Sequence, residues 1–232
     1  EDLHGLLDEL IKNFPAIISL NYVHNFKKND TLYDLDITNY HGETYLTETL
    51  DGIKYKIGPK SFFQTNSKQA KNLYDVVRKM ATIRPEHTVY DLYTGTGSIA
   101  LYVAKTANKV IGIETVAEAI EDAHFNMQLN DIQNTTFIAA TVEKILDEDF
   151  INQYGKPDVV ITDPPRAGMH EKVIEVLLSA EPQQIVYVSC NPSTQARDLN
   201  LLSEKYEILE VQPVDMFPNT FHIENVVNLR LK

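Results

Sequence analysis

The feature that most constrains the fold is an alternation of short apolar runs with helical stretches after Pro85. Buried strands that alternate with helices are typical of βαβ units, in which parallel strands form a sheet with helices on both faces. The pattern therefore predicts an α/β fold. The expected strands are 87–92, 109–113, 135–139, 158–162 and 184–189, and the expected helices are 98–105, 116–130, 142–153, 171–179 and 193–205.

The two ends of the chain depart from this alternation. Segments 206–214 and 221–231 read as strands with no helix between them, which predicts an antiparallel hairpin at the edge of the sheet. Leucines and isoleucines at helical spacing predict a helix over 3–11 that Pro15 ends. Extended runs follow at 16–23, 31–38, 44–50 and 53–57, with turns expected at 29–30 and 41–42. We therefore divide the chain into a small α+β segment over 1–60 and an α/β domain over 61–232, which opens with a helix over 67–80.

Composition excludes several classes of protein. No apolar run approaches the length that a membrane-spanning helix needs, and the N-terminus lacks the features of a signal peptide. A single cysteine excludes an internal disulfide framework and a cysteine-ligated zinc or iron–sulfur site within these residues, so we expect no metal. One free thiol fits a reducing cytoplasm, and we expect a cytoplasmic monomer that does not bind membranes.

Charge is distributed unevenly along the chain. The net charge of −12 argues against nucleic acid as a partner. Segment 52–84, however, has eight Lys and Arg residues against Asp75 alone. Such a basic stretch can bind phosphates, with Lys54, Lys56 and Lys60 as candidates; a solvated helix face explains the charge equally well.

A glycine-containing turn, Asp91-Leu92-Tyr93-Thr94-Gly95-Thr96-Gly97-Ser98, ends the first strand of the alternating region. Glycines there allow a ligand to approach the backbone at a helix N-terminus. Glu114 ends the next strand, where a carboxylate can accept hydrogen bonds from both hydroxyls of a ribose. The pattern indicates a cofactor that contains adenosine. It also satisfies the fingerprint of dinucleotide dehydrogenases, and a purely structural turn is the third interpretation.

The second motif is Asp163-Pro164-Pro165-Arg166-Ala167-Gly168, directly after an apolar strand. Two prolines stiffen the turn, so Asp163 should be held above the crevice at the end of the strand. Dehydrogenases have no use for this element, whereas methyltransferases that act on planar bases present it. The alternative is that Asp163 only caps the helix that follows.

The third motif surrounds Cys190, in the stretch IVYVSCNPSTQARD over 185–198. A lone cysteine is usually a small core residue. Here it follows a strand, precedes a predicted helix and has polar neighbours, Ser189 and Asn191. A helix N-terminus lowers the pKa of a nearby thiol. We therefore expect a reactive thiol whose pKa is lowered.

The fourth motif is Phe217-Pro218-Asn219-Thr220-Phe221-His222-Ile223-Glu224. On a strand, His222 and Glu224 would point to one face, and either could act as a base. A solvated strand edge is the competing interpretation.

Together, these motifs resemble the RNA uracil-5-methyltransferase family, whose members make 5-methyluridine in ribosomal and transfer RNA. The matching pieces are SFFQTN at 61–66, DLYTGTG at 91–97, GIE at 112–114, DPPRAGM at 163–169, VSCNPSTQARDL at 188–199 and FPNTFHIENVV at 217–227. The resemblance implies a Rossmann-like class I methyltransferase fold with a mostly parallel seven-stranded sheet. It also implies S-adenosylmethionine as the cofactor and RNA as the partner, with motif style favouring 23S ribosomal RNA over transfer RNA.

The resemblance also implies roles for individual residues. Cys190 would be the nucleophile that adds to C6 of uracil, and Glu224 the base. The cofactor would contact Gln64, Tyr93, Gly95, Gly97, Ser98, Glu114, Thr141 and Asp163. Ser98 stands where the family often has Asn, and Thr141 where many members have an amide. Asp163, Phe62 and Phe63 would contact the base, and Lys54, Lys56 and Lys60 the RNA phosphates.

The chain also departs from the family. Many members carry an N-terminal OB-like domain and some an iron–sulfur cluster, and neither is here, so we expect a C-terminal fragment whose first 60 residues belong to the central RNA-contacting region. Two other functions stay open: a methyltransferase for another base or an amino group with a structural Cys190, and a non-catalytic module that binds cofactor and RNA.

Overall fold

The computed structural model describes residues 2–29, 32 and 34–232. Its centre is a seven-stranded sheet in the order β10-β11-β9-β8-β5-β6-β7. Pairs among β5 to β9 are parallel, and β11 pairs antiparallel with both β9 and β10. The predicted class I methyltransferase fold with a C-terminal antiparallel hairpin is therefore confirmed. The strands are β5 Thr88–Leu92, β6 Lys109–Glu114, β7 Thr135–Ala139, β8 Val159–Thr162, β9 Gln184–Ser189, β10 Tyr206–Val214 and β11 Glu224–Leu231.

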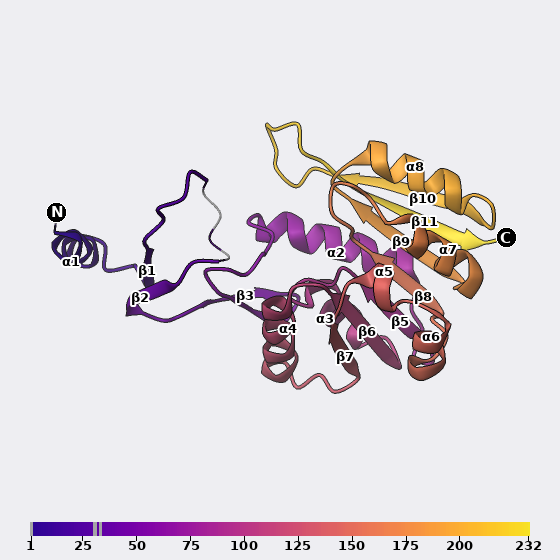
Figure 1. The fold of residues 1–232 in the computed structure, drawn as a ribbon, viewed down its shortest axis with the longest axis horizontal. Coiled ribbons are helices and arrows are strands. Elements are labelled where there is room, and N and C mark those ends of the chain that lie inside the picture. The colour runs from indigo at the N-terminus through magenta and orange to yellow at the C-terminus, as the bar shows by residue number, and fades with distance from the viewer. Residues whose placement is uncertain (1, 30–31, 33) are drawn as a thin grey trace.

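Helices cover both faces of this sheet, as the alternation predicts (Figure 1). One face packs on α2, α3 and α4, and the other on α5 to α8. The bounds are α2 Ser67–Ala81, α3 Ser98–Ala104, α4 Ala117–Leu129, α5 Val142–Ile145, α6 Glu148–Tyr154, α7 Glu171–Ala180 and α8 Pro192–Leu202. The helix expected over 142–153 is thus two helices, because Asp147 is extended and its side chain caps the second one through the Phe150 N–H.

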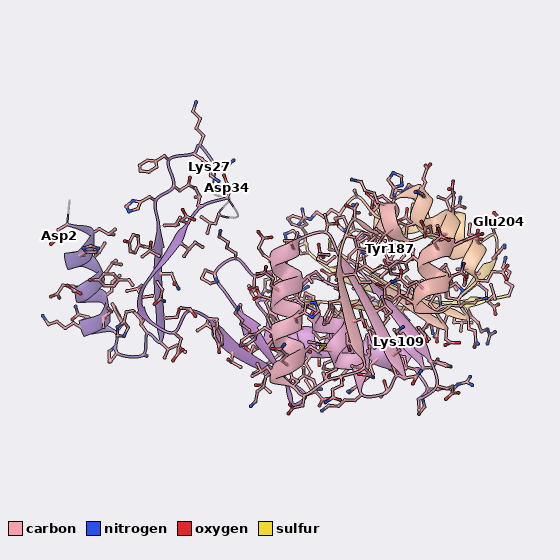
Figure 2. All side chains as sticks on the ribbon, turned by 60° about the horizontal axis from the view of Figure 1, so that its bottom comes forward. Asp2, Lys27, Asp34, Lys109, Tyr187 and Glu204 are labelled. Carbon is pink, nitrogen blue, oxygen red and sulfur yellow. The ribbon has the colours of Figure 1, made fainter. Side chains whose placement is uncertain are left out.

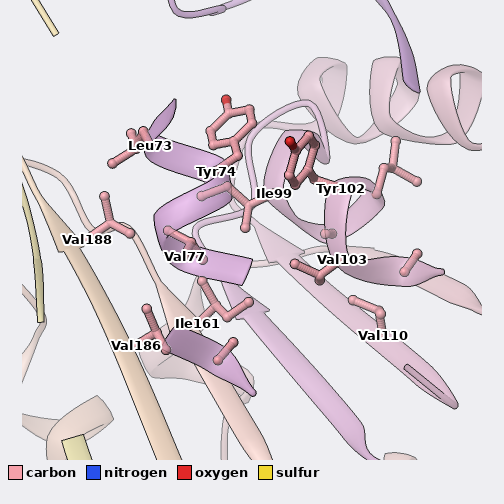
Figure 3. Packing of buried hydrophobic residues seen from close by; sticks show 14 of the residues in the cluster. Leu73, Tyr74, Val77, Ile99, Tyr102, Val103, Val110, Ile161, Val186 and Val188 are labelled. Carbon is pink, nitrogen blue, oxygen red and sulfur yellow. The ribbon is translucent and has the colours of Figure 1, made fainter. Parts of the chain in front are cut away.

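The side of α2 that packs on the large sheet is apolar at helical spacing because its side chains are buried there. Val77 of α2 packs among Ile161 of β8, Val186 and Val188 of β9, and Val103 of α3 (Figure 3). All five side chains are fully buried. Burial of a side chain of this size stabilises the fold by about 1.5–3 kcal/mol, so this face fixes how α2 lies on the sheet.

The first elements lie apart from the α/β unit (Figures 1 and 2). They are α1 Leu3–Asn13, which Asp2 caps, and the antiparallel pair β1 Ser19–Val23 and β2 Ile37–Gly42. A hydrogen bond of 2.7 Å from the Tyr40 hydroxyl to Asp8 Oδ1 ties α1 to β2. The expected turn at 41–42 is wrong, because both residues pair with β1 and continue the strand. The extended run expected over 31–38 falls partly on residues 31 and 33, which lie outside the described residues; only its last two residues belong to β2.

A second hairpin, β3 Leu46–Leu50 and β4 Ile53–Ile57, packs on the α/β unit. Asn130 at the end of α4 accepts a hydrogen bond from the Lys54 N–H at 2.8 Å and donates one to its carbonyl at 2.7 Å. Tyr55 is fully buried in the core under α2 and α3. The unit built around the large sheet thus includes residues before the boundary expected at 60, and that boundary stays a prediction.

No helix in the described part of the chain has the length and apolar character to cross a membrane.

Candidate active site

The turn between β5 and α3 has a backbone that few sequences can adopt. Tyr93, Gly95 and Gly97 have φ of 65°, 56° and 77°, in the left-handed region. Buried Asp91 holds the turn, since its Oδ2 accepts from Thr94 Oγ1 at 2.5 Å and from the Ala100 N–H at 3.0 Å. A Cβ on Gly97 would lie 2.6 Å from the Phe137 ring, whereas one on Gly95 would meet nothing within 4 Å. Gly97 therefore serves packing, and Gly95 leaves the backbone open to a ligand.

Glu114 links this turn to the next helix. Its Oε2 accepts from the Gly95 N–H at 3.1 Å, and its Oε1 accepts from the Val116 N–H at 3.0 Å. The side chain is half-buried, and each carboxylate oxygen keeps one lone pair. The carboxylate is thus fixed at the carboxyl end of β6 and able to accept two hydroxyl groups from a ligand.

A cavity of about 740 Å³ lies above these strand ends. Seven of the eight residues predicted for the cofactor line it; Gly97 does not. The seven are Gln64, Tyr93, Gly95, Ser98, Glu114, Thr141 and Asp163. Residues not predicted from the sequence also line it, among them Tyr74, whose hydroxyl donates to Ser98 Oγ at 3.1 Å. The volume is in the range of small-molecule and cofactor sites, and the acceptor pair on Glu114 fits a ribose, so the residues present fit S-adenosylmethionine.

Two carboxyl groups lie close enough to influence one another, and of the two only Asp163 lines the cavity. Asp163 follows β8 and lines the cavity; burial and the charges of Glu224 and Asp91 raise the pKa of Asp163 well above its ordinary value. Glu224 opens β11, and burial raises the pKa of Glu224 to about 7. Its buried Oε2 has no hydrogen-bond partner among the residues that the structure describes. An unpartnered acid with a pKa near neutrality is suited to exchange a proton with a ligand.

Cys190 lies directly after β9, opposite Glu224. The register pairs Ser189 with Asn225, so the next residues outward are Cys190 and Glu224. The thiol is half-buried. Burial, followed by repulsion from Glu224 and Asp163, raises the pKa of Cys190, and Arg166 opposes this through a hydrogen bond and its charge. The expected lowering of the thiol pKa is wrong, because desolvation by burial and the charges of the two carboxyl groups outweigh the opposing effect of Arg166.

The backbone around Cys190 is fixed by its two polar neighbours. Ser189 Oγ accepts from the Asn191 N–H at 3.0 Å, and the Asn191 side chain caps α8 by accepting from the Ser193 N–H at 3.2 Å. Pro192 occupies the first turn of the helix, where its missing N–H costs nothing. The thiol is therefore held between the end of a buried strand and a well-capped helix.

The residues predicted to contact the substrate fall into two groups. Phe62, Phe63 and Lys60 line the cavity, and Phe62 is 71% exposed at its mouth. Lys54 and Lys56 do not line it. Lys56 forms an ion pair with Asp122 at 2.8 Å, and Lys54 is exposed on β4.

The alternative base, His222, lies before β11 rather than on it, in the connection that follows β10. Its ring packs against Phe221, with 4.2 Å between centroids. It therefore does not share a strand face with Glu224, and the expectation of a common face is wrong because the strand starts two residues later.

One buried network has no counterpart in the sequence predictions. Asp198 on α8 is fully buried, and its Oδ2 accepts from the Met169 N–H at 2.8 Å and the Tyr187 hydroxyl at 2.7 Å. The signal was present: Gln195, Asp198 and Leu202 have the i, i+3, i+7 spacing of a buried helix face. Polar residues on such a face indicate a buried hydrogen-bond network. In the part of the chain that the structure describes, no cluster of His, Cys, Asp and Glu could hold a metal ion.

Comparisons with known proteins agree with this geometry. Residues 39–232 match the family described as "tRNA (Uracil-5-)-methyltransferase". A protein of Bacteroides thetaiotaomicron named "Uncharacterized RNA methyltransferase" is 56% identical over 98% of this chain and 50% of its own length. A protein of Porphyromonas gingivalis with the same name is 57% identical over 97% of this chain and 49% of its own length. The chain thus spans about half the length of the curated relatives that it matches.

Solved structures give the same result. The tRNA (uracil-54, C5)-methyltransferase of Pyrococcus abyssi, in complex with S-adenosyl-L-homocysteine, superposes with a TM-score of 0.82. It is 37% identical, and the match covers 94% of this chain and 52% of that one. The M. jannaschii tRNA m1G37 methyltransferase has a TM-score of 0.64 at 15% identity. The match covers all of this chain and 69% of the M. jannaschii chain. At that identity the likeness concerns the fold alone.

Proposed function

The chain belongs to the tRNA (uracil-5-)-methyltransferase family, and from this membership we propose that it transfers a methyl group from S-adenosylmethionine to C5 of a uridine in RNA. The observation that carries the proposal is that Cys190 and Glu224 face each other at the ends of β9 and β11, with Asp163 beside both. A thiol, a base of neutral pKa and a cofactor cavity are what methylation of a uracil carbon requires.

When bound, S-adenosylmethionine supplies an electrophilic methyl group. Glu114 accepts hydrogen bonds from the ribose hydroxyls, and the open backbone at Gly95 gives room for the cofactor. Gln64, Tyr93, Ser98 and Thr141 form the remaining contacts, with Gly97 shaping the turn. Asp163 lines the cavity and its charge acts on Cys190, so we assign it to both the cofactor and the base. The ordered acceptors around the cavity, and its volume, support this arrangement.

C5 of uracil is a poor nucleophile on its own. The reaction therefore needs a nucleophile from the protein that first adds to the ring and makes C5 reactive. The Cys190 sulfur, after its proton has gone to solvent, adds to C6, and the electrons of the C5–C6 double bond move into the carbonyl as an enolate. C5 would then take the methyl group from the sulfonium, whose sulfur would leave as a neutral thioether. Glu224 removes the remaining proton from C5, the bond between sulfur and C6 breaks, and the double bond reforms. Asp163 hydrogen-bonds to the edge of the base.

RNA must present its uracil unstacked, which costs on the order of a few kcal/mol. Phe62 and Phe63, which both line the cavity, offer stacking surfaces for the base or its neighbours. We assign the phosphate contacts to Lys54, Lys56 and Lys60, and the first 60 residues to an RNA-contacting region. From motif style we propose a uridine of 23S ribosomal RNA, modified in the cytoplasm by a monomer.

Trapping tests the chemistry. The protein is mixed with S-adenosylmethionine and with 5-fluorouridine-substituted transcripts of ribosomal and transfer RNA. Fluorine at C5 cannot leave as a proton, so the wild type should form a covalent complex that survives denaturing electrophoresis. Cys190→Ala should form none. The same adduct with this variant would disprove the assignment of the nucleophile, and its full activity on normal RNA would favour a methyltransferase with a structural Cys190.

The base and the target have their own tests. Glu224→Gln should accumulate the covalent intermediate on normal RNA, because the C5 proton then has no acceptor. Full turnover by this variant would show that another residue acts as the general base. A map of 5-methyluridine lost from cellular RNA after deletion of the gene identifies the target. Loss from transfer RNA alone would overturn the preference for ribosomal RNA.

A further inference from the structure

We propose that Tyr74 is a cofactor-binding residue, which acts together with Ser98 to bind the amino-acid end of S-adenosylmethionine. The inference rests on the proposed function in one respect, which is that S-adenosylmethionine is the methyl donor. Tyr74 lies on α2, a helix on which the sequence motifs placed no site residue. Both residues line the cavity, and the Tyr74 hydroxyl donates a hydrogen bond to Ser98 Oγ at 3.1 Å.

The hydroxyl of Tyr74 is a polar group on a helix face whose other buried side chains are apolar. Tyr74 is 3% exposed, and burial raises the pKa of Tyr74, so the group stays neutral and keeps its hydrogen. The hydroxyl points away from Val77, which packs on the sheet (Figure 3). A buried hydroxyl needs a polar partner, and Ser98 supplies one at the wall of the cavity rather than inside the core.

Two tyrosines hold Ser98. The Tyr55 hydroxyl donates to the Ser98 carbonyl at 3.0 Å and fixes the backbone, whereas Tyr74 binds the side chain. In the part of the chain that the structure describes, Ser98 Oγ has no further partner. The Ser98 hydroxyl can therefore donate its own hydrogen to a ligand, and the Tyr74 oxygen can accept one. Together, these two groups offer one donor and one acceptor to the cavity.

The position of this pair along the sheet indicates which part of the cofactor it meets. Glu114 at the end of β6 is assigned to the ribose, and the methyl group must point toward Cys190 after β9. The sulfur therefore lies over β5 and β8, which come between those two strands in the sheet. Ser98 follows β5, and Tyr74 comes from α2, which packs on this part of the sheet. The atoms beyond the sulfur, which end in a carboxylate and an ammonium group, are the ones that reach the pair.

The chemistry of the pair fits this end of the cofactor. The carboxylate accepts a hydrogen bond from the Ser98 hydroxyl, and the ammonium group donates one to the Tyr74 oxygen. Neutral hydroxyls suit the two groups because the charges of the carboxylate and the ammonium cancel. The competing interpretation is that Tyr74 only holds the start of α3 in place, in which case every part of the cofactor would depend on it equally.

Two ligands separate these roles. S-adenosylhomocysteine keeps the amino-acid end, whereas 5′-methylthioadenosine keeps the adenosine and the sulfur but has a methyl group in place of that end. Titration calorimetry with each ligand needs no RNA. We expect Tyr74→Phe to weaken binding of S-adenosylhomocysteine about tenfold and binding of 5′-methylthioadenosine less than about twofold. Ser98→Ala should have the same selective effect. The double variant should lose little more than either single variant, because the two hydroxyls act as a unit.

Tyr102→Phe is the matched control. Tyr102 lies beside Tyr74, with 5.5 Å between ring centroids, but its hydroxyl bonds to Asp75 at 2.8 Å and it does not line the cavity. Loss of this hydroxyl should leave the affinity for both ligands unchanged. Circular dichroism confirms that each variant is folded, and Ser98→Ala provides the test if Tyr74→Phe is not.

An affinity of Tyr74→Phe for S-adenosylhomocysteine equal to that of the wild type would overturn the proposal. An equal loss for both ligands would also overturn it, because Tyr74 would then only hold the start of α3. A selective loss in a protein that methylates neither ribosomal nor transfer RNA would instead count against the proposed function, while the assignment of Tyr74 to the amino-acid end would stand.

Discussion

Replacement of Glu224 by Gln is expected to make the folded protein more stable at pH 8. The pKa of Glu224 is raised from 4.5 to about 7 by burial. A carboxyl group whose pKa is raised on folding favours the folded state fully only below its unfolded pKa, and this stability is lost as the pH rises through the folded pKa. At pH 8 the wild type therefore carries a buried charge that the glutamine variant lacks. Asp163 adds to the effect, since the Glu224 charge also raises the pKa of Asp163.

The size of the effect follows from the two pKa values. A change from 4.5 to about 7 corresponds to about 3 kcal/mol in the free energy of unfolding, at roughly 1.4 kcal/mol for each tenfold change in proton affinity. Glu224 is partly accessible to solvent, which screens the charge and reduces the figure to about 2 kcal/mol. Most of it should develop between pH 5 and pH 7.

Urea denaturation at several pH values measures this difference. The series should run from pH 5.5 to pH 8, above the sequence pI of about 5.0 at which solubility is lowest. The stability of Glu224→Gln relative to wild type should grow by about 1 kcal/mol over that range. Glu175→Gln, at an exposed position on α7, is the matched control and should show no such trend. A constant difference, or a variant less stable than wild type at pH 8, would refute the reasoning.

Three further predictions concern the scaffold of the site. Gly97→Ala should lower the free energy of unfolding by about 1–3 kcal/mol and weaken cofactor binding in calorimetry, because its Cβ would overlap the Phe137 ring; unchanged affinity would contradict this. Tyr187→Phe should cost about 1–2 kcal/mol in urea denaturation, since it leaves buried Asp198 with one partner fewer, and a cost below about 0.5 kcal/mol on that scale would argue against the network. Asn130→Ala should speed hydrogen exchange in β4, which it holds by two hydrogen bonds; equal protection would show that the hairpin is held by its core contacts alone.

The fold was largely predictable because its central strands are buried on both faces. Strands of this kind are continuous apolar runs, and β5 to β9 begin and end within about one residue of the predicted bounds. The predicted bounds are wrong where a hydrogen bond determines where a helix or strand begins or ends. Asp147 interrupts the helix expected over 142–153 by capping a new one. His41 and Gly42 look like a turn, but pairing with β1 keeps them in the strand.

The sequence predicted which residues gather at the candidate site. It was less successful for the directions in which their pKa values shift. The carboxyl ends of parallel strands meet at one edge of a sheet, so motifs that follow different strands gather there. The pKa of Cys190 is raised by burial and then by the charge of Glu224, which lies 34 residues further along the chain. The spacing of Gln195, Asp198 and Leu202 indicates a buried face of α8, but not that Asp198 bonds the turn after β8. Partners at such long sequence separations leave no signal in the residues themselves.

The place of β11 in the sheet has a consequence for synthesis. This strand is formed by residues 224–231, yet it lies inside the sheet, between β10 and β9. Until those residues have been made, β9 is an open edge, and Cys190 has no acid opposite it. Cys190 and Glu224, the proposed nucleophile and base, therefore come together only when β11 inserts, in a step that contact order makes slow. A nascent chain can thus form its cofactor turn early but cannot assemble a working site until β11 has left the ribosome.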